Sequence, residues 1–257
     1  MVRSVDRSPL ARSVGAGLAG VGAVALLAGC STTQDEAARL QLNSARIRAA
    51  QLPTVVRSAG SPVQVEHVAV LTGHRARTFV VTVRNGGTRA VTDLPISVGV
   101  MAQGHHRLDL NARSTQELSY FDAHLPRIGP GQTVSWVFST SRRLPAKAHP
   151  FALVGSRPSP ATPAGVTAPT IAARVTGTQG AADGGAIVQV TLRNESTIPQ
   201  YQMPVYAVAA RRGHVVAAGA LVVPHLGSRK TLSVRVPVRG SLSDARLNVA
   251  APPAIVH

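Results

Sequence analysis

Two stretches of the chain match each other: residues 82–88 read TVRNGGT, and residues 191–197 read TLRNEST. The offset of 109 residues persists further on, where the Gly-His pair at 104–105 recurs at 213–214. A repeat on this scale predicts two copies of one structural unit in tandem.

A later match shows that the copies differ in length. Residues 128–136 (IGPGQTVSW) correspond to residues 226–234 (LGSRKTLSV), at an offset of 98 rather than 109. The first copy therefore holds 11 more residues than the second (109 minus 98), and the alignment places them near residues 111–121.

Apolar residues recur at every second position of the repeated segments, as they do in strands that bury one face. These positions are Phe79, Val81 and Val83 in the first copy and Val188, Val190 and Leu192 in the second. Glycine and proline turns separate the strands, and no long helical pattern intervenes. We therefore expect an all-β fold made of two tandem sandwiches.

The N-terminal segment combines a basic start, an apolar run over residues 14–29 and the sequence Leu27-Ala28-Gly29-Cys30. The run is shorter than the roughly 20 residues that a membrane-spanning helix needs, and it predicts a secretory signal. Small residues before the only cysteine of the chain resemble a bacterial lipobox, in which Cys30 would receive a diacylglyceryl group. An uncleaved anchor, or a chance cysteine after an ordinary signal, is the alternative.

The chain is strongly basic, with 27 Lys and Arg against 11 Asp and Glu and a formal net charge of +16. Removal of residues 1–29 would leave +14, because three arginines and one aspartate are lost. The preference for arginine, alanine, valine and glycine is typical of a GC-rich genome, so much of the charge could reflect codon usage. Basic pairs such as Arg142-Arg143 and Arg211-Arg212 would form a solvated surface or be drawn weakly to anionic envelope polymers and lipids.

A short helix is expected over residues 34–50, because Thr33 and Glu36 have the spacing of a capping box and good helix formers follow. It would serve as a solvated stalk, or its face with Leu40 and Ile47 could pack on a β unit. The predicted organisation is a signal peptide (1–29), a lipid anchor and helical stalk (30–60), a first sandwich (61–155), a proline-rich linker (156–167) and a second sandwich (168–257).

The strand that runs into the Asn-Gly turn at 81–87, the Leu-Pro-Ile opening at 94–96 and the turn at 128–133 resemble immunoglobulin-like or fibronectin type III-like modules of bacterial lipoproteins, of the FxLYD or CARDB kind. The resemblance covers residues 60–257 and rests on turn and strand chemistry. It implies a spacer, adhesion or assembly role, with no catalytic residues and no cofactor.

Signatures of catalysis are absent from the sequence: it has no Gly-x-Ser-x-Gly, no Ser-x-x-Lys and no His-Glu-x-x-His. The group His105, His106 and Asp109 could supply metal ligands, but adjacent histidines on a strand point to opposite faces. We expect neither an enzyme nor a metal protein. Asn194 begins an acceptor pattern for N-glycosylation, but the matching residues 85–87 indicate a turn instead.

Tyr120 and Phe121 lie beside the insertion that only the first copy has, and with Arg113 they are the candidate partner-binding residues. The alternatives are that the pair caps the open end of the sandwich, or that the insertion is only a longer connection. Tyr201 and Tyr206 are further candidates for an exposed aromatic platform.

These features predict a lipid-anchored protein on the extracytoplasmic face of the cell membrane. Its expected role is a non-enzymatic binding or scaffolding module for an envelope protein or a cell-wall polymer. Nucleic acid is not expected as a partner, because aromatics are not interleaved with the arginines. The alternatives are a solute- or glycan-binding lipoprotein that serves a transporter and, third, an uncharacterised hydrolase.

Overall fold

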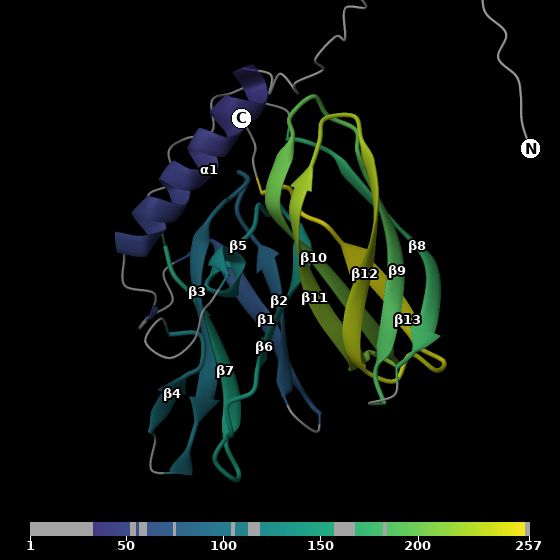
Figure 1. Ribbon diagram of the computed structural model, residues 1–257. Coiled ribbons are helices and arrows are strands. Elements are labelled where there is room, and N and C mark those ends of the chain that lie inside the picture. Colours follow the sequence, from purple (N-terminus) through teal and green to yellow (C-terminus); the bar gives the residue numbers. More distant parts are fainter. Residues whose placement is uncertain are drawn as a thin grey trace, which may run out of the picture. The chain divides into compact units, whose positions relative to one another are not determined.

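The computed structural model describes residues 33–51, 55–56, 61–73, 76–103, 106–112, 119–156, 168–181 and 184–254. Its described part is all-β apart from helix α1 (Thr33–Gln51) and a 3₁₀ turn, η2 (Tyr120–Asp122), so the expected fold class is confirmed at that level (Figure 1). No described helix is long and apolar enough to cross a membrane.

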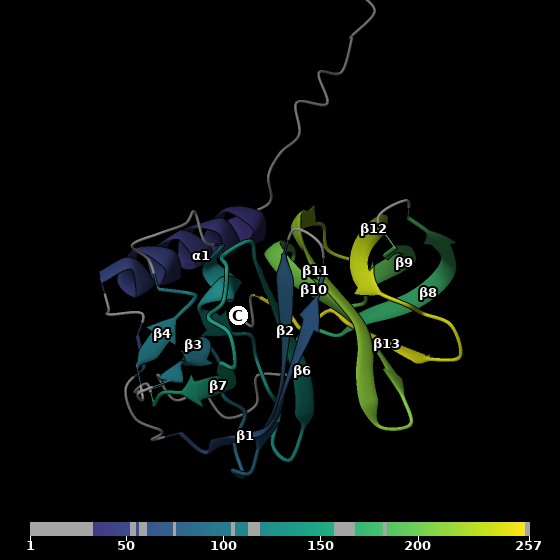
Figure 2. The same cartoon turned by 90° about the horizontal axis from the view of Figure 1, so that it is seen from below.

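The first copy of the repeat forms two antiparallel sheets. One sheet has the order β1-β2-β6, from β1 (Val63–Thr72), β2 (Arg77–Asn85) and β6 (Thr133–Thr140). In the other, β3 (Leu94–Met101) pairs with β4 (Arg107–Asp109), β5 (His124–Leu125) and β7 (His149–Val154). The two sheets form separate layers (Figure 2).

The second copy has equivalent strands, but they form one six-stranded sheet with the order β13-β10-β11-β12-β9-β8. The strands are β8 (Ile171–Gly180), β9 (Ala186–Asn194), β10 (Gln200–Arg211), β11 (His214–Leu226), β12 (Thr231–Gly240) and β13 (Arg246–Ala250). The path continues from β11 into β12 through only two residue pairs, Ala217 with Gly240 and Ala218 with Arg239. At this junction a Cβ atom on Gly219 would collide with the Pro237 carbonyl, so the close approach of the strands requires glycine.

The strand register is the same in both copies. Val83 pairs with Val134 across β2 and β6, and the equivalent Leu192 pairs with Leu232 across β9 and β12. The sequence offsets of 109 and 98 therefore correspond to one shared pairing scheme.

The alternating apolar positions form the core of each copy, as the sequence predicts. Phe79, Val81 and Val83 are fully buried, as are Val188, Val190 and Leu192. In the first copy they pack with Trp136 and Phe138, whose rings stack with centroids 5.9 Å apart. Burial of large side chains such as these supplies most of the stabilisation of a small β unit.

The outer face of β2 and β6 is also buried, which the alternation of the sequence did not predict. Val80 and Val137 point away from the first core, yet they are 0% and 1% exposed. They belong to a cluster that also contains Tyr206 of β10 and Ala218 of β11. The β10–β11 hairpin thus packs on the β1-β2-β6 sheet through apolar side chains (Figure 2).

Helix α1 was expected to be a solvated stalk or to pack through its Leu40 face, and the structure shows it packed through another face. Ala38 and Leu42 are buried against Ile198 and Tyr201, whereas Leu40 is 61% exposed. Ala38 and Leu42 are four residues apart and lie on one side of the helix, and Leu40 lies on the other.

Candidate functional site

The asparagine shared by the two copies of the motif has a structural role in both. The side chain of Asn85 is fully buried and donates to the carbonyls of Arg89, Ile128 and Gly129, at 2.8, 3.2 and 3.0 Å. The equivalent Asn194 is also fully buried and donates to Ile198 and Gly227, at 2.8 and 3.2 Å. Each asparagine ties the turn after one strand to the turn before another.

This geometry also bears on the glycosylation pattern at Asn194. The amide nitrogen that would carry a glycan is buried and already donates two hydrogen bonds. The folded chain therefore has no accessible acceptor at this position, which agrees with the interpretation of the segment as a turn.

The predicted partner-binding pair, Tyr120 and Phe121, forms η2 at the end of the first sandwich. Phe121 is 4% exposed, and its carbonyl accepts a 2.7 Å hydrogen bond from the indole nitrogen of the buried Trp136. Tyr120 is half-buried and stacks on the ring of His124, with centroids 4.3 Å apart. The ring of Phe121 is therefore not an exposed platform. Arg113 lies outside the described residues.

The residue at the start of the insertion, Asn111, is also buried and hydrogen-bonded within the fold. Asn111 is 1% exposed; its side chain accepts from the Val98 amide at 2.9 Å and donates to the carbonyls of Ile96 and Asp122, at 2.8 and 2.9 Å. It thereby fastens β3 to η2. A deletion meant to test the insertion as a binding loop should spare Asn111 and remain within residues 113–118.

Asp122 and Tyr206 bring two titratable groups to the contact between the repeats. Burial raises the pKa of the Asp122 carboxyl, although the hydrogen bond that it accepts from the Ser119 amide, at 2.9 Å, opposes this rise. Burial also raises the pKa of the Tyr206 phenol, and the nearby Asp122 charge adds to the effect. The Tyr206 hydroxyl is buried without a hydrogen-bond partner among the described residues.

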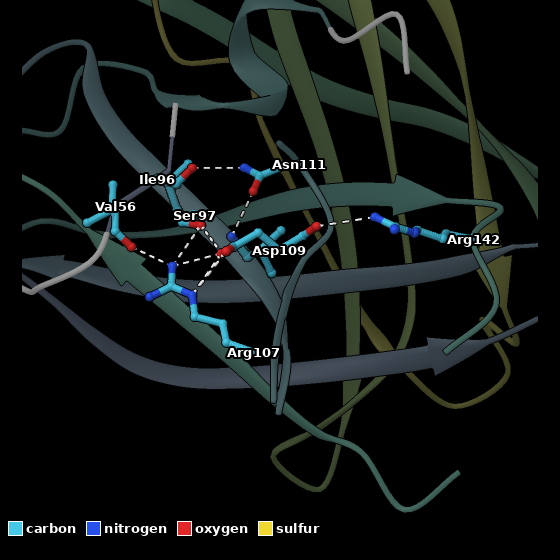
Figure 3. A network of polar contacts seen from close by, with 8 residues as sticks. Val56, Ile96, Ser97, Arg107, Asp109, Asn111 and Arg142 are labelled. Atoms are coloured by element: carbon cyan, nitrogen blue, oxygen red, sulfur yellow. Dashed lines mark hydrogen bonds and ion pairs between the residues drawn. The ribbon is translucent and has the colours of Figure 1, made fainter. Parts of the chain in front are cut away.

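A second polar cluster covers the outer face of β3 (Figure 3). Asp109 accepts from Arg107 at 2.7 Å and from the Ser97 hydroxyl at 2.6 Å, and Arg107 also donates to the carbonyl of Val56. The guanidinium of Arg107 lies 4.6 Å from the centre of the Phe151 ring. Since its carboxylate is already paired, Asp109 is poorly suited to bind a metal.

Leu27, Ala28, Gly29 and Cys30 lie outside the described residues, as does His105. Within the described part of the chain, no group of three or more His, Cys, Asp or Glu side chains could hold a metal ion.

The second copy has a polar surface that was not predicted from the sequence. The outward positions of β8, β9 and β12 carry the exposed arginines Arg174, Arg193 and Arg235. Neutral polar residues separate them: Gln189 and Thr191 on β9, and Thr231 and Ser233 on β12. The alternation that marks the buried positions of these strands also identifies this outward row, and the signal was therefore present in the sequence.

A shallow hollow of about 250 Å³ lies at one end of this surface, lined by residues of the β8–β9 turn and by Gly240, Ser241 and Leu242. Its volume is below the range of roughly 300–1,000 Å³ that is typical of small-molecule pockets.

Comparisons with known proteins do not identify a family. No family model matches the chain, and no curated protein matches it. Among solved structures, the secreted serine protease VesC from Vibrio cholerae aligns with 72% of this chain and 51% of its own length, at 10% identity and a TM-score of 0.16. The alignment thus spans about half of VesC, and a TM-score this low carries no argument about fold or activity.

Proposed function

We propose that this chain is a lipid-anchored protein of the extracytoplasmic membrane face that acts as a non-enzymatic binding or scaffolding module. The observation that carries the proposal is the position of the only cysteine of the chain, Cys30, directly after an apolar run and three small or aliphatic residues. Two acyl chains on that thiol would anchor the protein stably, because each buried CH₂ contributes about 0.8 kcal/mol.

The proposal includes two tandem immunoglobulin-like or fibronectin type III-like modules of the FxLYD or CARDB kind, over residues 61–155 and 168–257. Its support is the shared strand register of the two copies and the equivalent asparagine in each. Such modules suit a spacer or an assembly part.

The described polar groups favour binding over catalysis. Asn85, Asn111 and Asn194 hydrogen-bond to backbone groups, and Asp109 is paired with Arg107. The runner-up function is a solute- or glycan-binding lipoprotein, which would be expected to have a deep cleft with convergent polar groups. The small hollow beside Gly240 offers little support for it.

Cell fractionation tests the anchor. Cys30→Ala should release the protein into the medium or leave an unprocessed precursor, whereas the matched variant Ser31→Ala should remain in the membrane fraction. Unchanged membrane association and unchanged gel mobility of Cys30→Ala would refute the lipoprotein assignment. Crosslinking in intact cells followed by pull-down would then identify the partner.

A further inference from the structure

One face of the sheet is buried in the first copy of the repeat, and the equivalent face is exposed in the second. In the first copy, the outer face of β1-β2-β6 is covered by the β10–β11 hairpin, and Val80 and Val137 are buried there. At the sequence offsets of 109 and 98, their equivalents on β9 and β12 are Gln189 and Arg235, and both are exposed. This face thus forms an apolar contact in the first copy. In the second copy the equivalent face is exposed and carries polar and charged side chains.

The second face is cationic and rich in hydrogen-bonding groups. Arg193 lies opposite Ala172, two residues along β8 from Arg174, so the Cα atoms of the two arginines are roughly 7–8 Å apart. Arg235 lies opposite Gln189, about 14 Å from Arg193 for a rise of about 3.4 Å per residue and strands about 4.8 Å apart. The three arginines therefore form a triangle across three strands, with Arg174 and Arg235 about 12 Å apart for the same rise and strand spacing.

These cations are not neutralised within the described part of the chain. The ion pairs found there are Arg84 with Glu66 and Arg107 with Asp109, and neither involves this face. Arg235 makes one long side-chain contact, 3.4 Å to the amide oxygen of Gln179. Arg229 and Lys230 add positive charge at the turn before β12, while the nearby carboxylate, Glu195, lies beyond the end of β9.

We propose that the outward face of β8, β9 and β12 binds a linear phosphodiester polymer that carries free hydroxyl groups. Guanidinium groups bind phosphate through paired, charge-assisted hydrogen bonds. The serine, threonine and glutamine side chains between the arginines would bind the hydroxyl groups between successive phosphates. This inference rests on the proposed envelope location and adds the chemical class of the partner.

Two other polyanions fit the face less well. A bilayer surface would favour large apolar side chains that insert between lipids, but the one large hydrophobic residue found exposed in the described chain is Leu40 of α1. Single-stranded nucleic acid would favour aromatic side chains for base stacking, and the outward positions 187–193 and 231–237 contain none.

The test measures binding of the acylated full chain, purified in detergent, to a defined poly(glycerol phosphate) oligomer across a range of salt concentrations. One variant combines three substitutions on the face: Arg174→Gln, Arg193→Gln and Arg235→Gln. The matched control removes three exposed arginines elsewhere: Arg89→Gln, Arg143→Gln and Arg211→Gln. Both variants lose the same net charge.

The face variant should bind at least about tenfold more weakly than the parent chain, and the slope of log K against log salt should fall by about 2 to 3. The control should stay within about twofold at moderate salt, because long-range charge effects are screened there. Equal losses in the two variants would overturn the proposal, since net charge alone would then explain binding. Tighter binding to single-stranded DNA than to the polymer would also overturn it. The same holds if Cys30→Ala, which has no acyl chains to insert, binds phosphatidylglycerol vesicles more tightly than the polymer. Fractionation of Cys30→Ala tests the anchor separately, so failure of polymer binding leaves the anchor result intact.

Discussion

At the scale of single residues, the repeated asparagine explains why the motif recurs. Asn85 and Asn194 each satisfy backbone carbonyls of two different turns, which no aliphatic side chain could do. The motif therefore recurs because the fold needs an amide at this point. That need accounts for the asparagine of the glycosylation-like pattern at 194–196.

Replacing either asparagine by alanine should lower the free energy of unfolding by about 2–3 kcal/mol, because buried carbonyls lose their hydrogen-bond donors. Urea unfolding of Asn85→Ala and Asn194→Ala measures this loss. The matched control is Asn248→Ala, whose asparagine is exposed and whose cost should stay below about 0.5 kcal/mol. Equal costs at buried and exposed positions would contradict the structural role.

The partly buried Asp122 should make stability depend on pH. Because burial raises the pKa of its carboxyl above the ordinary value of 3.8, the folded state binds the proton more tightly than the unfolded state. Its contribution is fully present below about pH 3.8 and is lost as pH rises through the folded-state pKa.

Asp122→Asn keeps an oxygen acceptor for the Ser119 amide but has no charge to bury. Its urea midpoint should exceed that of the parent chain at pH 7, and the difference should shrink on acidification toward pH 4. The exposed Asp244 provides the control substitution, Asp244→Asn. A difference that is constant with pH would show that burial of the Asp122 charge is not its cause.

At the scale of elements, the sequence predicts the inner faces of the strands and misses their outer contacts. The alternation of Phe79, Val81 and Val83 correctly identifies one buried face of β2. Burial of Val80 follows from packing of the distant hairpin, and a local pattern contains no information about a partner that lies far along the chain. The same limit applies to α1, where the apolar pattern indicated Leu40 and tertiary contact selects Ala38 and Leu42.

The candidate site was predictable to a similar extent. The difference between the two repeat offsets indicates the segment around Tyr120 and Phe121, but it contains no information about the hydrogen bonds by which Trp136 and Asn111 anchor this segment. Hydrogen bonds between a side chain and a distant carbonyl leave no periodic signal in a sequence. The arginines on β8, β9 and β12 could have been predicted to share one exposed face. They alternate along these strands with the apolar positions that the sequence already indicated as buried.

The two-sided burial of β2 predicts a large difference between equivalent positions of the two copies. Val80→Asp should lower the free energy of unfolding by more than about 3 kcal/mol, because it buries an unpaired charge. Gln189→Asp, at the equivalent exposed position of β9, should cost less than about 1 kcal/mol. Urea unfolding of both variants gives the comparison. Similar costs would mean that the outer face of β2 is not buried in solution.

At the scale of the whole molecule, the contact between the copies matters more than the segment that joins them. The predicted linker, residues 156–167, lies almost entirely outside the described residues, whereas Tyr206 and Ala218 belong to the same buried cluster as Val80 and Val137. The proposed two modules would thus share an apolar boundary.

That boundary joins two unlike surfaces, a hairpin face of one copy and a sheet face of the other. A head-to-tail contact between similar units has no inherent end, and repetition between chains would build an open fibre. Both terminal surfaces of this pair differ from the surfaces that meet inside it. Gln189 and Arg235 stand where the first copy has Val80 and Val137, and Ser97, held by the Arg107 and Asp109 pair, stands where the second copy has Tyr206. Each outer face of the pair therefore lacks the apolar side chains on which a further unit of this kind would pack.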